Sequence, residues 1–173
     1  GSGATFLDVL ETLEAAQAAG LVVPLPGRAG RFAFVHALFR SHRYEALPLR
    51  RLFDLHANAA AALASAAGDG RLSERARHAC LAVPVGDAKT AVGLACQAAD
   101  EAERAYAYDE AAAHFERALV AARSLDPPDS LASLDLAVRL AGAVHRAGDP
   151  AGLPMLLDAA LRARDGGDDR ALV

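Results

Sequence analysis

The chain has 173 residues and a mass of 17.9 kDa, which corresponds to one domain or to one domain with a small satellite. Hydrophobic residues make up 53% of it, aromatic residues only 5%, and the net charge is -4. This composition excludes a disordered chain. It also argues against a mainly β protein, because alanine supplies much of the apolar content and favours helices. The acidic balance argues against a free-standing nucleic-acid-binding domain.

The cysteine content and the lack of targeting patterns predict a cytoplasmic setting. Cys80 and Cys96 are too few for a disulfide framework and are typical of a reducing compartment. No apolar run approaches the ~20 residues that a membrane-spanning helix needs, and no signal-peptide pattern is present. Gly1–Gly3 resemble a cloning remnant, and an initiator methionine is missing. We therefore expect a segment of a longer cytoplasmic protein, with no membrane partner.

The N-terminal part predicts a helix, a β-hairpin and a second helix. Apolar residues recur at helical spacing over Thr5–Ala19, and Gly20 is a helix stop. Two short runs, Leu21–Val23 and Arg31–Val35, flank a stretch rich in proline and glycine and predict a β-hairpin. A second helix is expected over about His36–Ala46. It should end before Pro48, because the residue before a proline disfavours helical backbone angles.

The rest of the chain predicts helices joined by short loops. Ser73, Asp87 and Asp109 are the expected N-caps of three of these helices. The pattern indicates an α-solenoid or an irregular bundle and a fold that is mainly α. The helices are expected over about 49–67, 73–83, 88–107, 109–123, 130–146 and 151–164.

One helix carries the signature of close helix packing. Ala111, Phe115 and Ala118 follow the spacing Ala-x-x-x-Phe-x-x-Ala, which resembles the second helix of a tetratricopeptide repeat. Looser versions of the pattern begin at Ala76 and at Gly152. The first-helix consensus of such repeats is absent. We therefore expect degenerate repeats, with Ala111, Phe115 and Ala118 as repeat-core residues.

The segment Gly30–Arg40, with Tyr44 after it, resembles the end of the winged-helix region of STAND-type signalling ATPases. It is similar in particular to actinobacterial regulators related to the maltose-regulon activator, which carry a LuxR-type DNA-binding domain. Related ATPase modules are fused to nucleotide cyclases or kinases. The order of elements matches over about Thr5–Arg123. The resemblance implies a winged-helix-like element with one β-hairpin over residues 1–47, and tetratricopeptide-like antiparallel helical pairs, an α-solenoid, over residues 48–173.

The same resemblance implies a nucleotide-sensing role for His36 and Arg40. His36 matches a histidine that contacts the β-phosphate of ADP in the resting state, and Arg40 matches the same helix. Val35 and Ala37 replace the methionine and aspartate of the more familiar Met-His-Asp form. The role needs the ATP/ADP-binding domain of a parent protein, since this chain contains no Gly-x-x-x-x-Gly-Lys-[Ser/Thr] loop. The alternative is a polar residue at a helix start that faces solvent.

The other polar clusters are interpreted as structural. No two histidines are spaced i, i+4, so we expect no metal site. A helix cap with exposed i, i+4 partners is the favoured interpretation of a group that also resembles an acid–base cluster, namely Asp109, Glu110, His114 and Arg117. Nearby acidic residues argue against DNA contact by the basic group Arg40, Arg43, Arg50 and Arg51.

Three functions follow from the sequence. The leading hypothesis is a non-catalytic regulatory and protein-interaction segment of a STAND signalling protein, a LuxR-type transcriptional regulator, that couples nucleotide state to effector or partner binding. The second is an isolated helical scaffold that binds a peptide or a second copy of itself. The third is a helical domain that senses a small molecule. We expect no catalytic residue, no cofactor in this segment, a protein or adjacent-domain partner, and no direct contact with nucleic acid.

Overall fold

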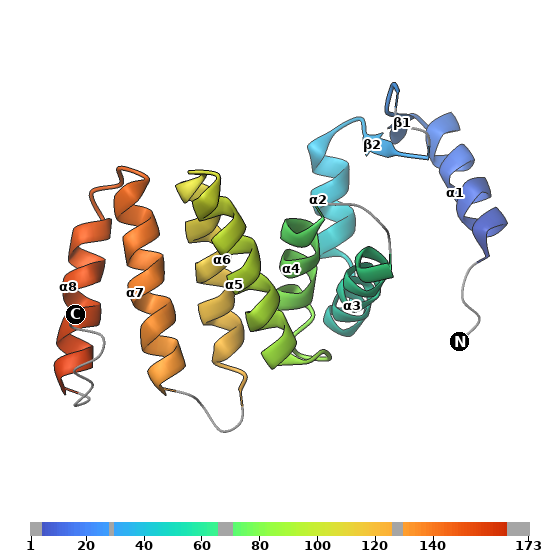
Figure 1. The fold of residues 1–173 in the computed structure, drawn as a ribbon. Helices are drawn as coiled ribbons and strands as arrows, with labels where there is room; N and C mark the ends of the chain where they lie inside the picture. Colours follow the sequence, from blue (N-terminus) through green and yellow to red (C-terminus); the bar gives the residue numbers. More distant parts are fainter. Residues whose placement is uncertain (1–4, 28–29, 66–70, 126–129, 166–173) are drawn as a thin grey trace. The chain divides into compact units, whose positions relative to one another are not determined.

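The computed structural model describes residues 5–27, 30–65, 71–125 and 130–165 (Figure 1). These residues form eight α-helices and one antiparallel pair of strands, so the mainly α fold with a small hairpin is confirmed. None of these helices is long and apolar enough to cross a membrane. The chain divides into two compact units, Gly1–Leu49 and Arg50–Val173.

The first unit contains two helices and the hairpin between them. Helix α1 spans Phe6–Ala18, strands β1 and β2 span Val22–Pro24 and Phe32–Phe34, and α2 spans Ala37–Glu45. In the hairpin, Val22 pairs with Phe34 and Pro24 with Phe32. The helix–hairpin–helix order agrees with the sequence-based expectation.

The start and the end of α1 are both set by local chemistry. The Thr5 hydroxyl accepts a hydrogen bond from the backbone N–H of Asp8, and the Asp8 carboxylate accepts one from the N–H of Thr5. This capping box satisfies backbone donors that have no partner inside the helix. At the other end, Gly20 has a φ of 69°, and the next N–H, that of Leu21, bonds back to Ala16. Glycine adopts this left-handed backbone conformation easily because it has no Cβ, so it commonly ends helices.

The second unit is a series of helices in which consecutive members pack together from α4 to α8 (Figure 1). Helix α4 also contacts α6, the second helix after it in the chain. The bounds are α3 Leu49–Ser65, α4 Leu72–Leu81, α5 Ala88–Arg104, α6 Tyr108–Ala122, α7 Ser130–Arg146 and α8 Gly152–Asp165.

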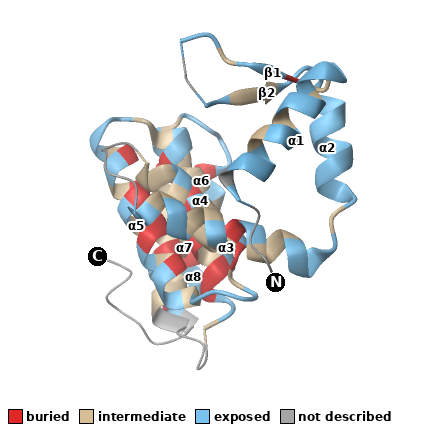
Figure 2. Ribbon diagram, turned by 90° about the vertical axis from the view of Figure 1, so that its right-hand side faces the viewer, coloured by how far each residue is buried: buried red, intermediate tan, exposed pale blue. Residues whose placement is uncertain are grey.

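The core of the second unit consists almost entirely of alanine around one phenylalanine. The buried residues, red in Figure 2, lie mostly on the helices of this unit. Phe115 is fully buried and lies among small side chains of α5, α6 and α7. Alanine allows helix axes to approach closely, and the large ring then fills the space between them. The buried cluster comprises Ala95, Ala99, Ala102, Ala111, Phe115, Ala118, Ala122, Leu136 and Ala143.

Small residues also occupy the closest approaches on other helices. Ala76 on α4 and Ala111 on α6 have no exposed surface. At Gly152 on α8, an added Cβ would lie 2.4 Å from the backbone nitrogen of His145 on α7. The three positions that begin the Ala-x-x-x-Phe-like patterns are therefore all buried contact points, and the last one excludes any side chain.

The predicted N-caps have different outcomes. Asp87 caps α5 as expected, since its carboxylate accepts hydrogen bonds from the N–H groups of Lys89 and Thr90. The predictions for Ser73 and Asp109 are wrong. Both lie inside the first turn, after the N-cap positions of α4 and α6. Ser73 instead uses its hydroxyl to contact α6.

Replacing Phe115 with alanine is expected to lower the free energy of unfolding by about 3–5 kcal/mol, because the ring is fully buried and its neighbours are too small to close the cavity. Val120→Ala is the matched control on the same helix, since Val120 is 57% exposed, and it should cost less than about 1 kcal/mol. Urea denaturation of both variants measures the difference. Equal losses would contradict the assignment of Phe115 to the centre of the core.

Candidate functional site

The two residues expected to sense nucleotide lie close together on an exposed helix. His36 is the N-cap residue of α2, has extended backbone dihedrals and makes no side-chain cap hydrogen bond. Its ring lies 5.7 Å from the ring of Phe39, centroid to centroid. Arg40 lies one turn further along, and no residue of α2 is buried. Both side chains are thus accessible to another molecule or domain.

The whole first unit exposes large apolar side chains. Among the described residues of this unit, Val22 alone is a buried apolar residue. The other buried apolar residues of the described chain belong to the second unit. A soluble domain of normal composition buries most such groups. The exposed set is Leu7, Val9, Val23, Phe34, Val35, Leu38, Phe39, Tyr44 and Leu49.

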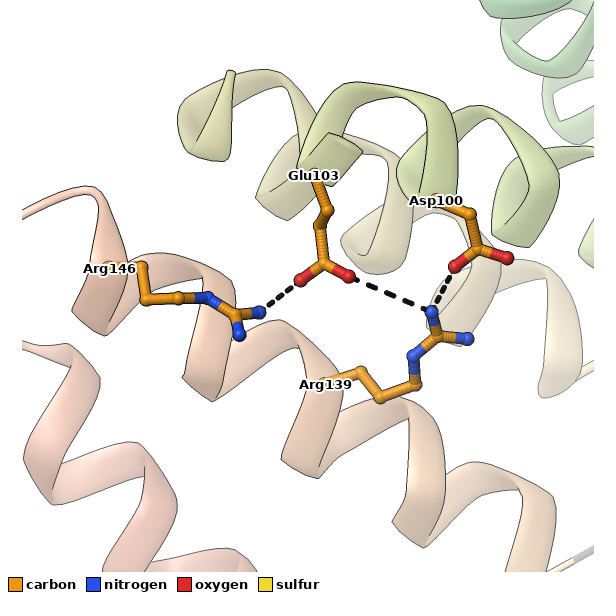
Figure 3. A network of polar contacts seen from close by, with 4 residues as sticks. All are labelled: Asp100, Glu103, Arg139 and Arg146. Carbon is orange, nitrogen blue, oxygen red and sulfur yellow. Dashed lines mark hydrogen bonds and ion pairs between the residues drawn. The ribbon is translucent and has the colours of Figure 1, made fainter. Parts of the chain in front are cut away.

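In the second unit, an ionic network joins α5 to α7 (Figure 3). Asp100 and Glu103 on α5 pair with Arg139 and Arg146 on α7. The guanidinium carbon of Arg139 also lies 4.4 Å from the centroid of the Phe115 ring, within cation–π range. The acidic residues of α5 thus pair with arginines of another helix, α7.

A second polar cluster joins α4 to α6 and is centred on His114, which is only 1% exposed. The hydroxyl of Ser73 lies 2.8 Å from Oε1 of Glu110 and 2.9 Å from Nε2 of His114. On the other side of the ring, Nη1 of Arg117 lies 3.3 Å from Nδ1 of His114. Nε2 of His114 also lies 3.7 Å from Oε1 of Glu110, the i, i+4 partner expected from the sequence. The expectation that His114 is exposed is wrong, because α4 covers the ring.

The donors and acceptors of this cluster fit one proton arrangement. Arg117 has only donors, so Nδ1 of His114 must accept and Nε2 must carry the proton. The Nε2–H then donates to Ser73, whose own hydroxyl proton goes to the carboxylate of Glu110. His114 is consequently not a base toward Ser73. The cluster joins the two helices and orients Arg117.

A groove of about 270 Å³ lies beside this cluster, between α4 and α6. Arg117, oriented by His114, is one of its walls. The groove combines apolar side chains with charged ones, which is typical of a binding surface. Its lining consists of Arg77, Cys80 and Leu81 from α4, and Glu116, Arg117 and Val120 from α6.

The two cysteines are free and partly buried, and both pack against the buried core. Burial raises the pKa of the Cys80 thiol to about 11, and burial also raises the pKa of Cys96. The Cys80 thiol donates to the carbonyl of Ala91 at 3.6 Å. A protonated thiol is a poor nucleophile, so Cys80 contributes an apolar surface to the groove.

Two histidines that sequence reasoning left scattered meet between α3 and α4. Nδ1 of His56 lies 2.7 Å from Nδ1 of His78, so one nitrogen donates and the other accepts. Burial lowers the pKa of both, and the charge of Arg77 lowers both further. Within the described residues, no group of three or more potential metal ligands occurs. The pair is separated by 22 positions, so helical spacing alone gave no signal for it.

Comparisons with protein-family models, curated proteins and solved structures find no match for this chain. The resemblance to the STAND winged-helix region therefore stays a prediction. The same holds for the roles of His36 and Arg40 and for the tetratricopeptide-like repeat assignment.

Lowering the pH from about 7.5 to about 5.5 is expected to reduce the free energy of unfolding. Burial holds the pKa of His56, His78 and His114 below the ordinary value of 6.5, so the unfolded chain binds protons more readily in this window. The stability these residues contribute is present above pH 6.5 and is lost as the pH falls through their folded pKa values. Carboxylates stay ionised over most of the interval.

Urea denaturation at several pH values measures this slope. His114→Gln should flatten it, whereas His145→Gln, at an exposed position, should leave it unchanged. A pH-independent free energy of unfolding would contradict the account.

Proposed function

We propose that this chain is a non-catalytic regulatory and protein-interaction segment of a cytoplasmic STAND-type signalling protein, such as a LuxR-type transcriptional regulator. The observation that carries the proposal is the unequal burial of the two units. The first unit leaves most of its large apolar side chains exposed, while the second has a packed core. A surface of that kind is covered when a neighbouring domain or partner docks on it.

The resemblance implies that the neighbouring domain binds a nucleotide. An ATP- or ADP-binding domain of the parent protein would contact α2, with His36 and Arg40 toward the nucleotide phosphates. Both residues are exposed on a helix without buried positions, so they are free to make such contacts. A contact formed only in the resting state would shift the equilibrium between resting and active states.

The second unit supports an interaction role rather than a chemical one. Its polar groups are used between helices: the α5–α7 network and the His114 cluster both bridge neighbours. These bridges keep the outer surfaces of the helices in fixed relation, as a binding scaffold requires. An isolated scaffold, without a parent ATPase, would need the same second unit. The exposed apolar side chains of the first unit favour the regulatory segment, because they suit docking on a neighbouring domain.

Small-molecule sensing is the remaining candidate, and one observation favours it. A cavity of about 230 Å³ lies between α3, α4 and α5, lined mainly by alanines, with Asp87 and Thr90 at one side. Ligand sites are usually larger, about 300–1,000 Å³. The cavity suits a small effector at most, so this function ranks third, after the regulatory segment and the isolated scaffold.

His36→Ala tests the proposed function. In the isolated chain the melting temperature should stay nearly unchanged, because His36 is exposed and makes no cap hydrogen bond. In the parent protein, ADP affinity should fall by about tenfold and basal output should rise, because a charge-assisted contact of the resting state is lost. Calorimetry with ADP and a reporter assay measure the two effects.

His42→Ala is the matched control on the same exposed helix. It should change neither ADP affinity nor output. Unchanged ADP affinity in the His36 variant would favour the isolated scaffold. A large loss of stability in the isolated chain would make His36 a structural residue.

A further inference from the structure

The groove between α4 and α6 carries two arginines, Arg77 and Arg117. Arg139, Arg146 and Arg162 form ion pairs with carboxylates. Arg77 and Arg117, on opposite walls of the groove, form none within the part of the chain that the structure describes. The lining contains a single carboxylate, that of Glu116, so the groove has a net positive charge.

Arg117 is held in place before any ligand binds. Its guanidinium donates to Nδ1 of His114, and that ring is fixed by Ser73 on α4. A guanidinium has five N–H donors, and His114 is the hydrogen-bond partner found for it here. The remaining donors are available for a carboxylate, and less conformational freedom is lost on binding because the side chain is already oriented.

Half of the residues that line the groove are apolar: Cys80, Leu81 and Val120. Leu81 is 38% exposed and Val120 is 57% exposed, although both belong to helices whose other faces are well packed. Cys80, with its thiol protonated and bonded to Ala91, continues the same surface. An apolar side chain inserted here would cover Leu81 and Val120, while acidic groups beside it would reach the arginines.

We propose that this groove docks a short acidic segment of a partner protein, in which one apolar side chain is flanked by carboxylates. The apolar side chain contacts Leu81 and Val120, and the carboxylates pair with Arg77 and Arg117. Glu116 repels a third carboxylate, which restricts the orientation of the segment. The inference rests on the proposed interaction role and adds the surface and the chemistry of the partner.

Fluorescence polarisation with two synthetic peptide libraries tests the proposal. In the first, a central Leu, Ile, Phe or Met is flanked by Asp or Glu; in the second, Asn or Gln replaces every acid. The wild-type chain should bind members of the acidic library and bind their amide counterparts at least about tenfold more weakly. Binding should also weaken with added salt, since the charges lie at the surface.

Arg77→Gln with Arg117→Gln should weaken binding of the best acidic peptide by at least about tenfold. Arg75→Gln with Arg104→Gln is the matched control: it removes the same charge from α4 and α5 outside the groove and should change affinity by less than about twofold. Far-UV circular dichroism and thermal melting confirm that both variants fold. Val120→Glu, at an exposed position, should also abolish binding without loss of fold.

Three results would overturn the proposal: no binding of the acidic library by the wild-type chain, equal binding of acidic and amide peptides, or equal losses in the two double variants. Self-association abolished by Arg77→Gln with Arg117→Gln would also overturn it, because a second copy would then occupy the groove. None of these measurements involves nucleotide or His36. Failure here therefore leaves the proposed regulatory function intact, and failure of the His36 test leaves the groove intact.

Discussion

The close approach of α5 and α6 is the constraint on which the second unit depends. Alanines on both helices bring their backbones together, and Phe115 fills the space that remains toward α7. Because the neighbours of Phe115 are already the smallest side chains that favour a helix, they leave little room for compensating substitutions. Arg139 extends over the ring and pairs with Asp100 on α5, so charged groups at the edge of the core stabilise the same three-helix contact.

The candidate binding surface is a consequence of that core. The position of α6 against α5 presents His114 toward α4, where Ser73 satisfies its Nε2–H and Arg117 satisfies its Nδ1. The wall of the α4–α6 groove is thus connected to the packed interior through one buried ring. The first unit has no comparable core among its described residues. The two units thus differ in burial, and under the proposed function the first unit would gain burial by docking, whereas the second has its own packed core.

The sequence predicted local features well and cross-helix features poorly. Apolar spacing, Gly20 and the two short runs on either side of the proline- and glycine-rich stretch were enough to predict the order of elements, because each signal depends on residues close together in the chain. Ser73 and Asp109 were wrongly assigned as caps, since cap residues and first-turn residues have similar compositions. The burial of His114 and the pairing of His56 with His78 depend on which helix covers which, and a single sequence does not contain that information.

Native-state hydrogen exchange measured by mass spectrometry tests most directly the central claim, that the two units differ in how far they carry their own cores. In the isolated chain, backbone amides of α5, α6 and α7 should exchange slowest, at the rate of global unfolding, because they surround Phe115. Amides of α1, the hairpin and α2 should exchange far faster, through local opening that costs little burial. Equal protection in the two units would contradict the account, because it would show that the first unit is stable without a docking partner.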